Sequence, residues 1–267
     1  MTAWVLALAF WLALAPPLTG AETGRRRAPI LNIDGVVNGA SFAAAPDNFV
    51  APNGIISIFG VDLSLRTKQV SDSDLVRGRL PLVLGGVQVR IGEIPAPLYF
   101  VSPQQINAQV PSEITPGDWA LTVVRENLSG ENAARVKVRA AAPGLFAFVA
   151  HTDYTLVGRG DPQGSTPARP GEIVVLFGTG FGATAPAVFA GELPDFAARV
   201  MLPARAWLGD TLLPAYLLRY VGLAPGFAGL YQINLELPAD VSAGDLQVRV
   251  EIDGFSTQAG VRIAVEK

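Results

Sequence analysis

The stretch Pro52–Gly60 reads PNGIISIFG, and the stretch Pro170–Gly178 reads PGEIVVLFG. Each copy is a turn followed by a short β-branched and aromatic run that ends at a glycine. The two copies share their first isoleucine, their phenylalanine and that glycine. Such a run is too short for a helix and is apolar on both faces, which is typical of a buried strand. Two copies of one core strand predict two copies of one domain.

The repeat extends beyond the core strand. Gln105–Asn107 and Gln232–Asn234 both read QIN, and Leu213–Ala215 reads LPA where Ile94–Ala96 reads IPA. The core strands are 118 residues apart (170 − 52), but the QIN stretches are 127 residues apart (232 − 105). The second copy therefore carries nine more residues (127 − 118), and we place most of them in Val221–Leu230.

Short strands separated by turns fill the rest of the chain. Val87–Ile91 and Leu246–Ile252 alternate apolar and polar residues, which is the period of a half-buried strand. The 28 glycines and 21 prolines among 267 residues favour many turns over long helices. We predict an all-β protein of two tandem immunoglobulin-like β-sandwiches behind a signal peptide, each sandwich of roughly 100 residues.

The predicted domain organisation has five parts. Residues 1–21 form a signal peptide, 22–35 a linker, 36–146 the first sandwich, 147–168 a polar connector and 169–267 the second sandwich. The connector is placed where glycine, proline and polar residues separate the two copies of the repeat.

The start of the chain predicts export. Val5–Leu14 is an uninterrupted apolar run, Pro16 and Pro17 end it, and Thr19–Ala21 puts small residues before a cleavage point after Ala21. The run is too short to span a bilayer, which needs about 20 apolar residues. We therefore expect a secreted protein, extracellular or at the cell surface, with no stable membrane insertion after cleavage; the periplasm is the alternative location.

Composition excludes several kinds of chemistry. The chain has no cysteine, so disulfides, thiolate metal sites and cysteine nucleophiles are absent. His151 is the only histidine, so a serine–histidine–aspartate triad would have to use it, and a histidine cluster for zinc cannot form. Charged residues are only 16% and the formal net charge is −3, which argues against nucleic acid as a partner. We expect no enzyme and no cofactor.

Seven short stretches carry a family resemblance: Val37–Phe42, Phe59–Gly60, Ile94–Pro97, Val101–Asn107, Ala142–Phe146, Leu176–Gly180 and Gly222–Phe227. Together they resemble the uncharacterised C-terminal module of secreted acidobacterial, Solibacter-type proteins, which is similar to tandem immunoglobulin-like TIG/IPT domains. The resemblance covers nearly the whole chain after residue 21. It implies an extracellular module, and it brings no catalytic residues.

Some motifs match functional patterns, but the residues around them do not favour those functions. Gly178–Ala183 matches G-x-G-x-x-A, but no amphipathic run follows it to form the helix that a dinucleotide site needs. Arg159–Asp161 reads RGD on an expected loop, which we interpret as a chance match. Asp72 and Asp74 could contribute to weak calcium binding but lack a full ligand loop. We interpret the repeated glutamine and asparagine as side chains that hydrogen-bond to backbone groups near a strand end. The alternative is that they bind a sugar.

The extra segment of the second copy supplies the candidate site. Val221–Leu230 has no charged side chain and contains Val221, Leu223, Phe227 and Leu230. Exposed apolar segments usually mark contacts, so we expect the segment either to fold back between the two sandwiches or to bind a partner. We favour the first alternative.

The function that these observations favour is non-enzymatic binding or scaffolding outside the cell, through protein–protein contact or adhesion. The alternative is a carbohydrate-binding module that recognises an extracellular polysaccharide. Exposed coplanar aromatic rings would favour sugar, whereas an exposed apolar loop or a bare strand edge would favour a protein partner. The partner is thus an unidentified extracellular protein or polysaccharide.

Overall fold

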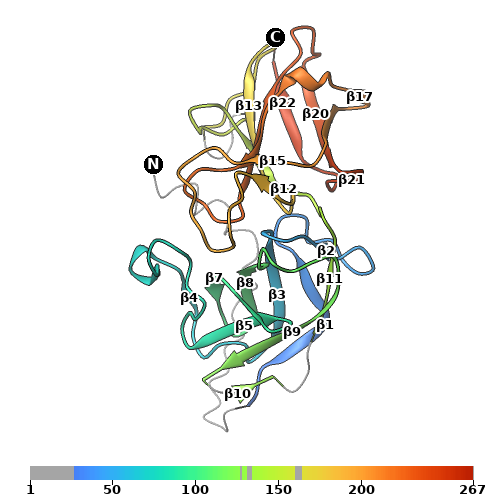
Figure 1. The fold of residues 1–267 in the computed structure, drawn as a ribbon. Coiled ribbons are helices and arrows are strands. Elements are labelled where there is room, and N and C mark those ends of the chain that lie inside the picture. The colour runs from blue at the N-terminus through green and yellow to red at the C-terminus, as the bar shows by residue number, and fades with distance from the viewer. Residues whose placement is uncertain (1–26, 127, 131–133, 160–163, 267) are drawn as a thin grey trace.

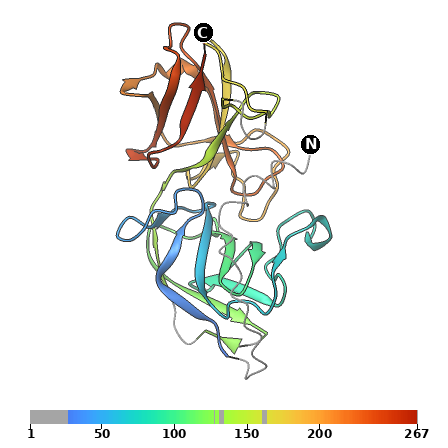
Figure 2. The same cartoon turned by 180° about the vertical axis from the view of Figure 1, so that it is seen from behind.

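A computed structural model describes residues 27–126, 128–130, 134–159 and 164–266. The predicted signal peptide, 1–21, lies outside the described residues, as does most of the RGD tripeptide. The described residues contain no α-helix; besides strands they form two short 3₁₀ turns, η1 (Asp72–Asp74) and η2 (Ala215–Leu217). The prediction of an all-β sandwich architecture is confirmed, with four sheets arranged as two face-to-face pairs that are stacked end to end (Figures 1 and 2).

The first sheet pair is built from residues 30–138. One sheet has the order β1-β3-β8-β7-β4, and the other has the order β2-β11-β9-β5-β6 with β10 on β9. All strand pairings are antiparallel except that of β11 with β2. The strands are β1 (Ile30–Asn38), β2 (Phe49–Val50), β3 (Ile55–Val61), β4 (Lys68–Gln69), β5 (Val87–Ile91), β6 (Ile94–Ala96), β7 (Leu98–Val101), β8 (Gln105–Gln109), β9 (Gly117–Arg125), β10 (Leu128–Ser129) and β11 (Ala134–Val138).

The second sheet pair is built from residues 144–265. Its sheets have the orders β12-β13-β19-β18-β15-β14 and β17-β16-β20-β21, with β22 on β20. The strands are β12 (Gly144–Ala150), β13 (Ile173–Thr179), β14 (Thr184–Ala185), β15 (Arg199–Val200), β16 (Ala204–Leu208), β17 (Thr211–Leu212), β18 (Leu218–Leu223), β19 (Tyr231–Glu236), β20 (Gly244–Ile252), β21 (Phe255–Ser256) and β22 (Arg262–Val265).

Strand register repeats between the two pairs. In β3, Phe59 lies opposite Gln105 of β8, and in β13 Phe177 lies opposite Gln232 of β19. The duplicated PNGIISIFG and PGEIVVLFG stretches are thus the central strands β3 and β13 of two equivalent sheets. Their residues are almost all buried because neighbouring strands flank them and the facing sheet covers them.

Each sheet pair encloses its own hydrophobic core. Ile56, Ile58 and Ile106 meet Leu121 and Val89 of the facing sheet in the first pair, all fully buried. The matching core of the second pair includes the side chains of Leu176, Phe181, Tyr231, Ile233 and Val250. Fully burying such a side chain stabilises the fold by about 1.5–3 kcal/mol relative to leaving it in water. These cores hold the sheets face to face.

Two strands cross the predicted boundaries. β1 begins at Ile30, inside the segment 22–35 that we assigned to a linker. β12 occupies residues that we divided between the end of the first sandwich and the connector, yet it pairs with β13 of the second sheet pair. The reason is the repeat itself: Leu31 of β1 lies opposite Gly60, and Leu145 of β12 lies opposite Gly178, so each strand flanks its own core strand.

Candidate functional site: the junction of the two sheet pairs

The four predicted site residues separate into two groups. Val221 and Leu223 are the end of strand β18, where they lie opposite Ile233 and Tyr231 and pack into the core of the second sheet pair. Leu230 lies in the turn before β19 and packs with Phe146 and other apolar residues in a smaller cluster. The first three residues of the predicted extra segment are therefore strand and not loop, because β18 extends to Leu223.

The turn between β18 and β19 contacts the first sheet pair. Ala228 is buried against Ile55, Leu80 and Tyr99, and the Tyr99 hydroxyl donates a hydrogen bond to the Ala228 carbonyl. Burial raises the pKa of Tyr99, although that hydrogen bond opposes the shift. Phe227 is half-buried beside this contact and packs against the cluster that contains Leu230. The turn thus lies between the two sheet pairs, in the region that we call the junction.

Buried polar side chains connect the two sheet pairs across the junction. The hydroxyl of Thr179 accepts a hydrogen bond from the Ile55 N–H at 2.7 Å and donates one to the Gly229 carbonyl at 2.7 Å. The amide of Gln109 donates to the Asn53 carbonyl at 3.0 Å and accepts from the Gly191 N–H at 2.6 Å. Because these groups are buried, each lost hydrogen bond would leave an unpaired polar group and destabilise the contact.

Two glycines allow this close approach. Gly229 has a φ of +64°, and a Cβ there would lie 2.5 Å from the Asn53 carbonyl oxygen of the first sheet pair. Gly180 has a φ of +78°, and a Cβ there would lie 2.2 Å from the Ala142 carbonyl oxygen. Gly180 belongs to the G-x-G-x-x-A match, which is followed directly by the short strand β14. Its glycines serve the junction and precede no helix that could hold a pyrophosphate.

An apolar groove opens beside the junction. It has a volume of about 580 Å³, and its lining includes Val76, Leu80, Leu82, Val83, Ile94 and Pro95. The side chains of Val76, Leu82 and Val83 are 60%, 44% and 55% exposed. The segment between β4 and β5 that supplies most of this lining is teal in Figure 1. It is held to the second sheet pair by the Leu80 N–H bond to the Gly191 carbonyl at 2.9 Å.

Sequence analysis did not single out this groove. Its signal is present in the sequence, because Leu80–Leu84 reads LPLVL, an apolar run that no period assigns to a strand or helix. The same argument that selected Val221–Leu230 as an apolar loop applies to this segment. Within Leu80–Leu84, Leu82 and Val83 remain in contact with water, whereas Leu80 and Leu84 are buried.

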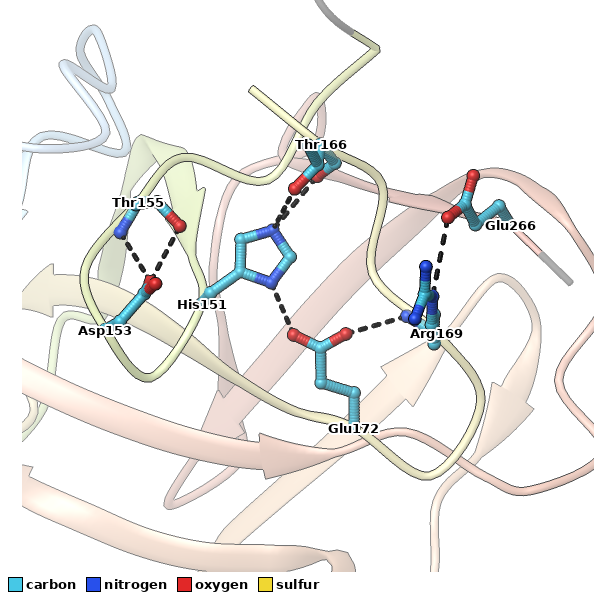
Figure 3. A network of polar contacts seen from close by, with 7 residues as sticks. All are labelled: His151, Asp153, Thr155, Thr166, Arg169, Glu172 and Glu266. Carbon is cyan, nitrogen blue, oxygen red and sulfur yellow. Dashed lines mark hydrogen bonds and ion pairs between the residues drawn. The ribbon is translucent and has the colours of Figure 1, made fainter. Parts of the chain in front are cut away.

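A polar network surrounds the only histidine (Figure 3). The Nδ1 atom of His151 contacts the Glu172 carboxylate, and its Nε2 atom lies 3.0 Å from the Thr166 carbonyl oxygen. The other carboxylate oxygen of Glu172 accepts a hydrogen bond from the Arg169 N–H at 2.9 Å. The network fastens the described part of the loop between β12 and β13, residues 151–159 and 164–172, onto the second sheet pair. Both ring nitrogens are engaged, which is the geometry of a structural contact.

The contacts of His151 favour its charged form. Nδ1 contacts the Glu172 carboxylate, whereas Nε2 lies 3.0 Å from the Thr166 carbonyl oxygen and 3.1 Å from the Thr166 hydroxyl, so it donates to the carbonyl when protonated and accepts from the hydroxyl when neutral. Burial disfavours the charged ring, but the hydrogen bonds to the Glu172 carboxylate and the Thr166 carbonyl and the charges of Glu172 and Asp153 raise the pKa of His151 above its usual value. The contact is therefore strongest at acidic pH.

Of the two candidate calcium ligands, Asp74 is engaged by other side chains. Asp74 accepts hydrogen bonds from Lys68 and from the Ser71 hydroxyl, which lower its pKa to about 2. Within the described ranges, no group of three or more histidine, cysteine, aspartate or glutamate side chains could hold a metal ion. In the same residues, no helix is long and apolar enough to cross a membrane.

The repeated glutamine and asparagine side chains bond to each other. Gln105 donates to the Asn107 side-chain oxygen at 2.8 Å, and Gln232 donates to that of Asn234 at 2.7 Å. The Asn107 oxygen also accepts a bond from the Ser57 hydroxyl at 3.1 Å. The pairs tie side chains to side chains within the sheet, where we expected bonds to backbone groups.

Comparison with known proteins adds little to these observations. No protein-family model and no curated protein matches the sequence. Solved structures with weak similarity include a surface glycan-binding protein, SGBP-B of the Bacteroides ovatus mixed-linkage glucan utilization locus, in complex with a heptasaccharide. Its identity is 12% and its TM-score 0.32, over 83% of this chain and 45% of that protein.

Two further structures are similar at the same level. The extracellular region of plexin A4 is 10% identical with a TM-score of 0.29, over 94% of this chain and 17% of that protein. SGBP-B from a xyloglucan utilization locus in Bacteroides uniformis is 11% identical with a TM-score of 0.27, over 89% and 50%. This chain spans half or less of each of these three proteins. The resemblance to the acidobacterial module stays a prediction from the sequence.

Proposed function

We propose that the chain is a non-enzymatic binding or scaffolding protein that works outside the cell and docks a partner protein in the apolar groove. The observation that carries this proposal is the exposure of Val76, Leu82 and Val83 around one groove beside the junction. Water-exposed apolar residues gathered in one place are characteristic of interaction surfaces. Export is part of the proposal and rests on the apolar run before Ala21.

The junction supports a scaffolding role. We treat each sheet pair as one domain, and the buried bonds of Thr179, Gln109 and Asn53 join the two. A net contribution of about 1 kcal/mol for each such hydrogen bond makes the junction a substantial contact. A surface that is held on a fixed framework loses less conformational entropy when it binds a partner.

The groove fits a protein better than a sugar. Apart from Arg79 and Glu113, its lining is aliphatic and contains prolines, with no aromatic ring that could stack on a sugar face. The two described tryptophans have other contacts: Trp119 donates its Nε1–H to the Thr115 carbonyl, and the guanidinium of Arg249 lies 3.7 Å from the Trp207 ring centroid. The described residues therefore offer no coplanar set of exposed tryptophan rings.

The charged residues at the groove indicate which charge a partner would carry. Arg79 lines the groove and pairs with Glu192 across the junction. Glu113 also lines the groove, is exposed, and has no ion pair with any described residue. We therefore propose that the partner is a protein segment that inserts aliphatic side chains into the groove and places a lysine or arginine beside Glu113.

The test is a binding measurement with a matched control. Immobilised wild-type protein is used to capture proteins from the secretome of the source cells, and the captured protein is purified and titrated against variants. Val83→Asp should abolish binding, because it places a charge in an apolar contact. Leu212→Asp, at an exposed apolar position on β17 outside the groove, should leave binding unchanged. Equal binding by wild type and Val83→Asp would overturn the proposal.

A further inference from the structure

A second pocket lies at the junction, separate from the apolar groove. Its volume is about 420 Å³, and no residue lines both spaces. The first sheet pair contributes the side chains of Ser41, Asp47, Phe49 and Arg139, and the second contributes those of Phe255 and Ser256. We call it the arginine pocket. Because both sheet pairs build it, it exists only while the junction is formed.

Arg139 is held in this pocket by aromatic rings. Its guanidinium carbon lies 4.6 Å from the ring centroid of Phe49 on β2 and 4.0 Å from that of Phe255 on β21. These cation–π contacts come from opposite sides of the junction and fix the orientation of the planar guanidinium. The N–H donors point outward in the plane of the group, so stacked rings do not use them.

The guanidinium N–H groups of Arg139 have no acceptor among the described residues. Its Nε atom is buried without a hydrogen-bond partner, and the guanidinium takes part in no described hydrogen bond or ion pair. Burial lowers the pKa of Arg139, while the nearby charge of Asp47 opposes the shift. A buried donor without an acceptor destabilises a protein, so the unpaired Nε of this partly buried arginine indicates an external acceptor.

We infer that the arginine pocket binds the carboxylate of a sugar acid, a uronate residue. A carboxylate matches the fork of N–H donors on a guanidinium and can accept two bonds from it. Ser41, Ser256 and Asp47 line the same pocket, and hydroxyl and carboxylate groups are partners for sugar hydroxyls. The volume lies within the usual range of small-molecule sites.

Asp47 distinguishes a sugar acid from an acidic peptide. Both ligands carry a carboxylate for Arg139, but only the sugar brings hydroxyl donors that a second carboxylate can accept. The carboxylate of either ligand meets the charge of Asp47, and in the sugar acid the neighbouring hydroxyls can donate to Asp47 and offset that repulsion. The inference is independent of the proposed function, because it uses none of the groove residues and a different ligand class.

Titration calorimetry of the whole protein with D-glucuronate tests the inference, with D-glucose as the neutral control and N-acetyl-L-glutamate as the acidic control. Glucuronate should bind at least about tenfold more tightly than either control, a difference of 1.4 kcal/mol. Arg139→Gln should weaken glucuronate binding by at least about tenfold, while Val83→Asp in the groove should not change it. Asp47→Ala should reduce the preference for glucuronate over N-acetyl-L-glutamate.

Three outcomes would overturn the inference. Equal affinity for glucose and glucuronate would exclude the carboxylate as the recognised group, and equal affinity for N-acetyl-L-glutamate would assign the pocket to acidic peptides. Unchanged glucuronate affinity in folded Arg139→Gln would exclude the guanidinium. If that variant does not fold, Arg139→Lys gives the same test, because lysine keeps the charge on the rings but cannot bind a carboxylate through two parallel bonds.

Discussion

Thr179→Val tests whether the buried polar bonds hold the junction together. Valine has nearly the shape of threonine but cannot hydrogen-bond, and Thr179 is fully buried. The change removes the bond from the Ile55 N–H and the bond to the Gly229 carbonyl. It therefore leaves one donor of the first sheet pair and one acceptor of the second without a partner.

The expected magnitude follows from those two groups. Each of the two buried polar groups left unsatisfied costs about 1–3 kcal/mol, so the free energy of unfolding should fall by about 2–6 kcal/mol. Urea unfolding at fixed pH measures this change. The control is Thr211→Val, since Thr211 is exposed on β17 and its substitution should alter stability by less than about 0.5 kcal/mol. A change of that small size for Thr179→Val would refute the role given to the junction bonds.

Four further predictions concern other parts of the chain. His151→Gln should remove a stabilisation that wild type shows at low pH and loses as pH rises through the raised pKa of folded His151, so unfolding curves at several pH values should converge at alkaline pH. Phe227→Ala should destabilise by about 1–3 kcal/mol in urea, less than the loss for a fully buried phenylalanine, because its ring is half-buried; no change would place it outside the junction contact. EDTA should leave the melting temperature unchanged because Lys68 neutralises Asp74, and a fall of many degrees would indicate a calcium site. Mass spectrometry of exported protein should show a mature N-terminus near residue 22, and an intact Met1 or Thr2 would contradict cleavage after Ala21.

Strands with a clear period were predictable from sequence. Val87–Ile91 alternates in sequence, and β5 covers the same residues with Val87, Val89 and Ile91 buried. The duplicated stretch was also sufficient to identify the central strands β3 and β13. In both cases the information is local, because the side chains that define the period are the ones that the facing sheet buries.

Strand partners and pockets depend on contacts between distant parts of the chain, and local sequence patterns do not predict such contacts. β12 looks like the end of one domain until its pairing with β13 is known. The arginine pocket joins Phe49, Arg139 and Phe255, which are far apart in the chain and carry no shared motif. The buried state of Val221 and Leu223 likewise follows from the extension of β18 along β19 and not from their composition.

Hydrogen–deuterium exchange of the chain, alone and with its captured protein partner, tests the central claim most directly. The account predicts that binding slows exchange in residues 76–84 and 94–96, which line the apolar groove and its edges, while the central strands β3 and β13 stay unchanged. Protection confined to the second sheet pair, or no protection in residues 76–84, would contradict the claim that this groove is the docking surface.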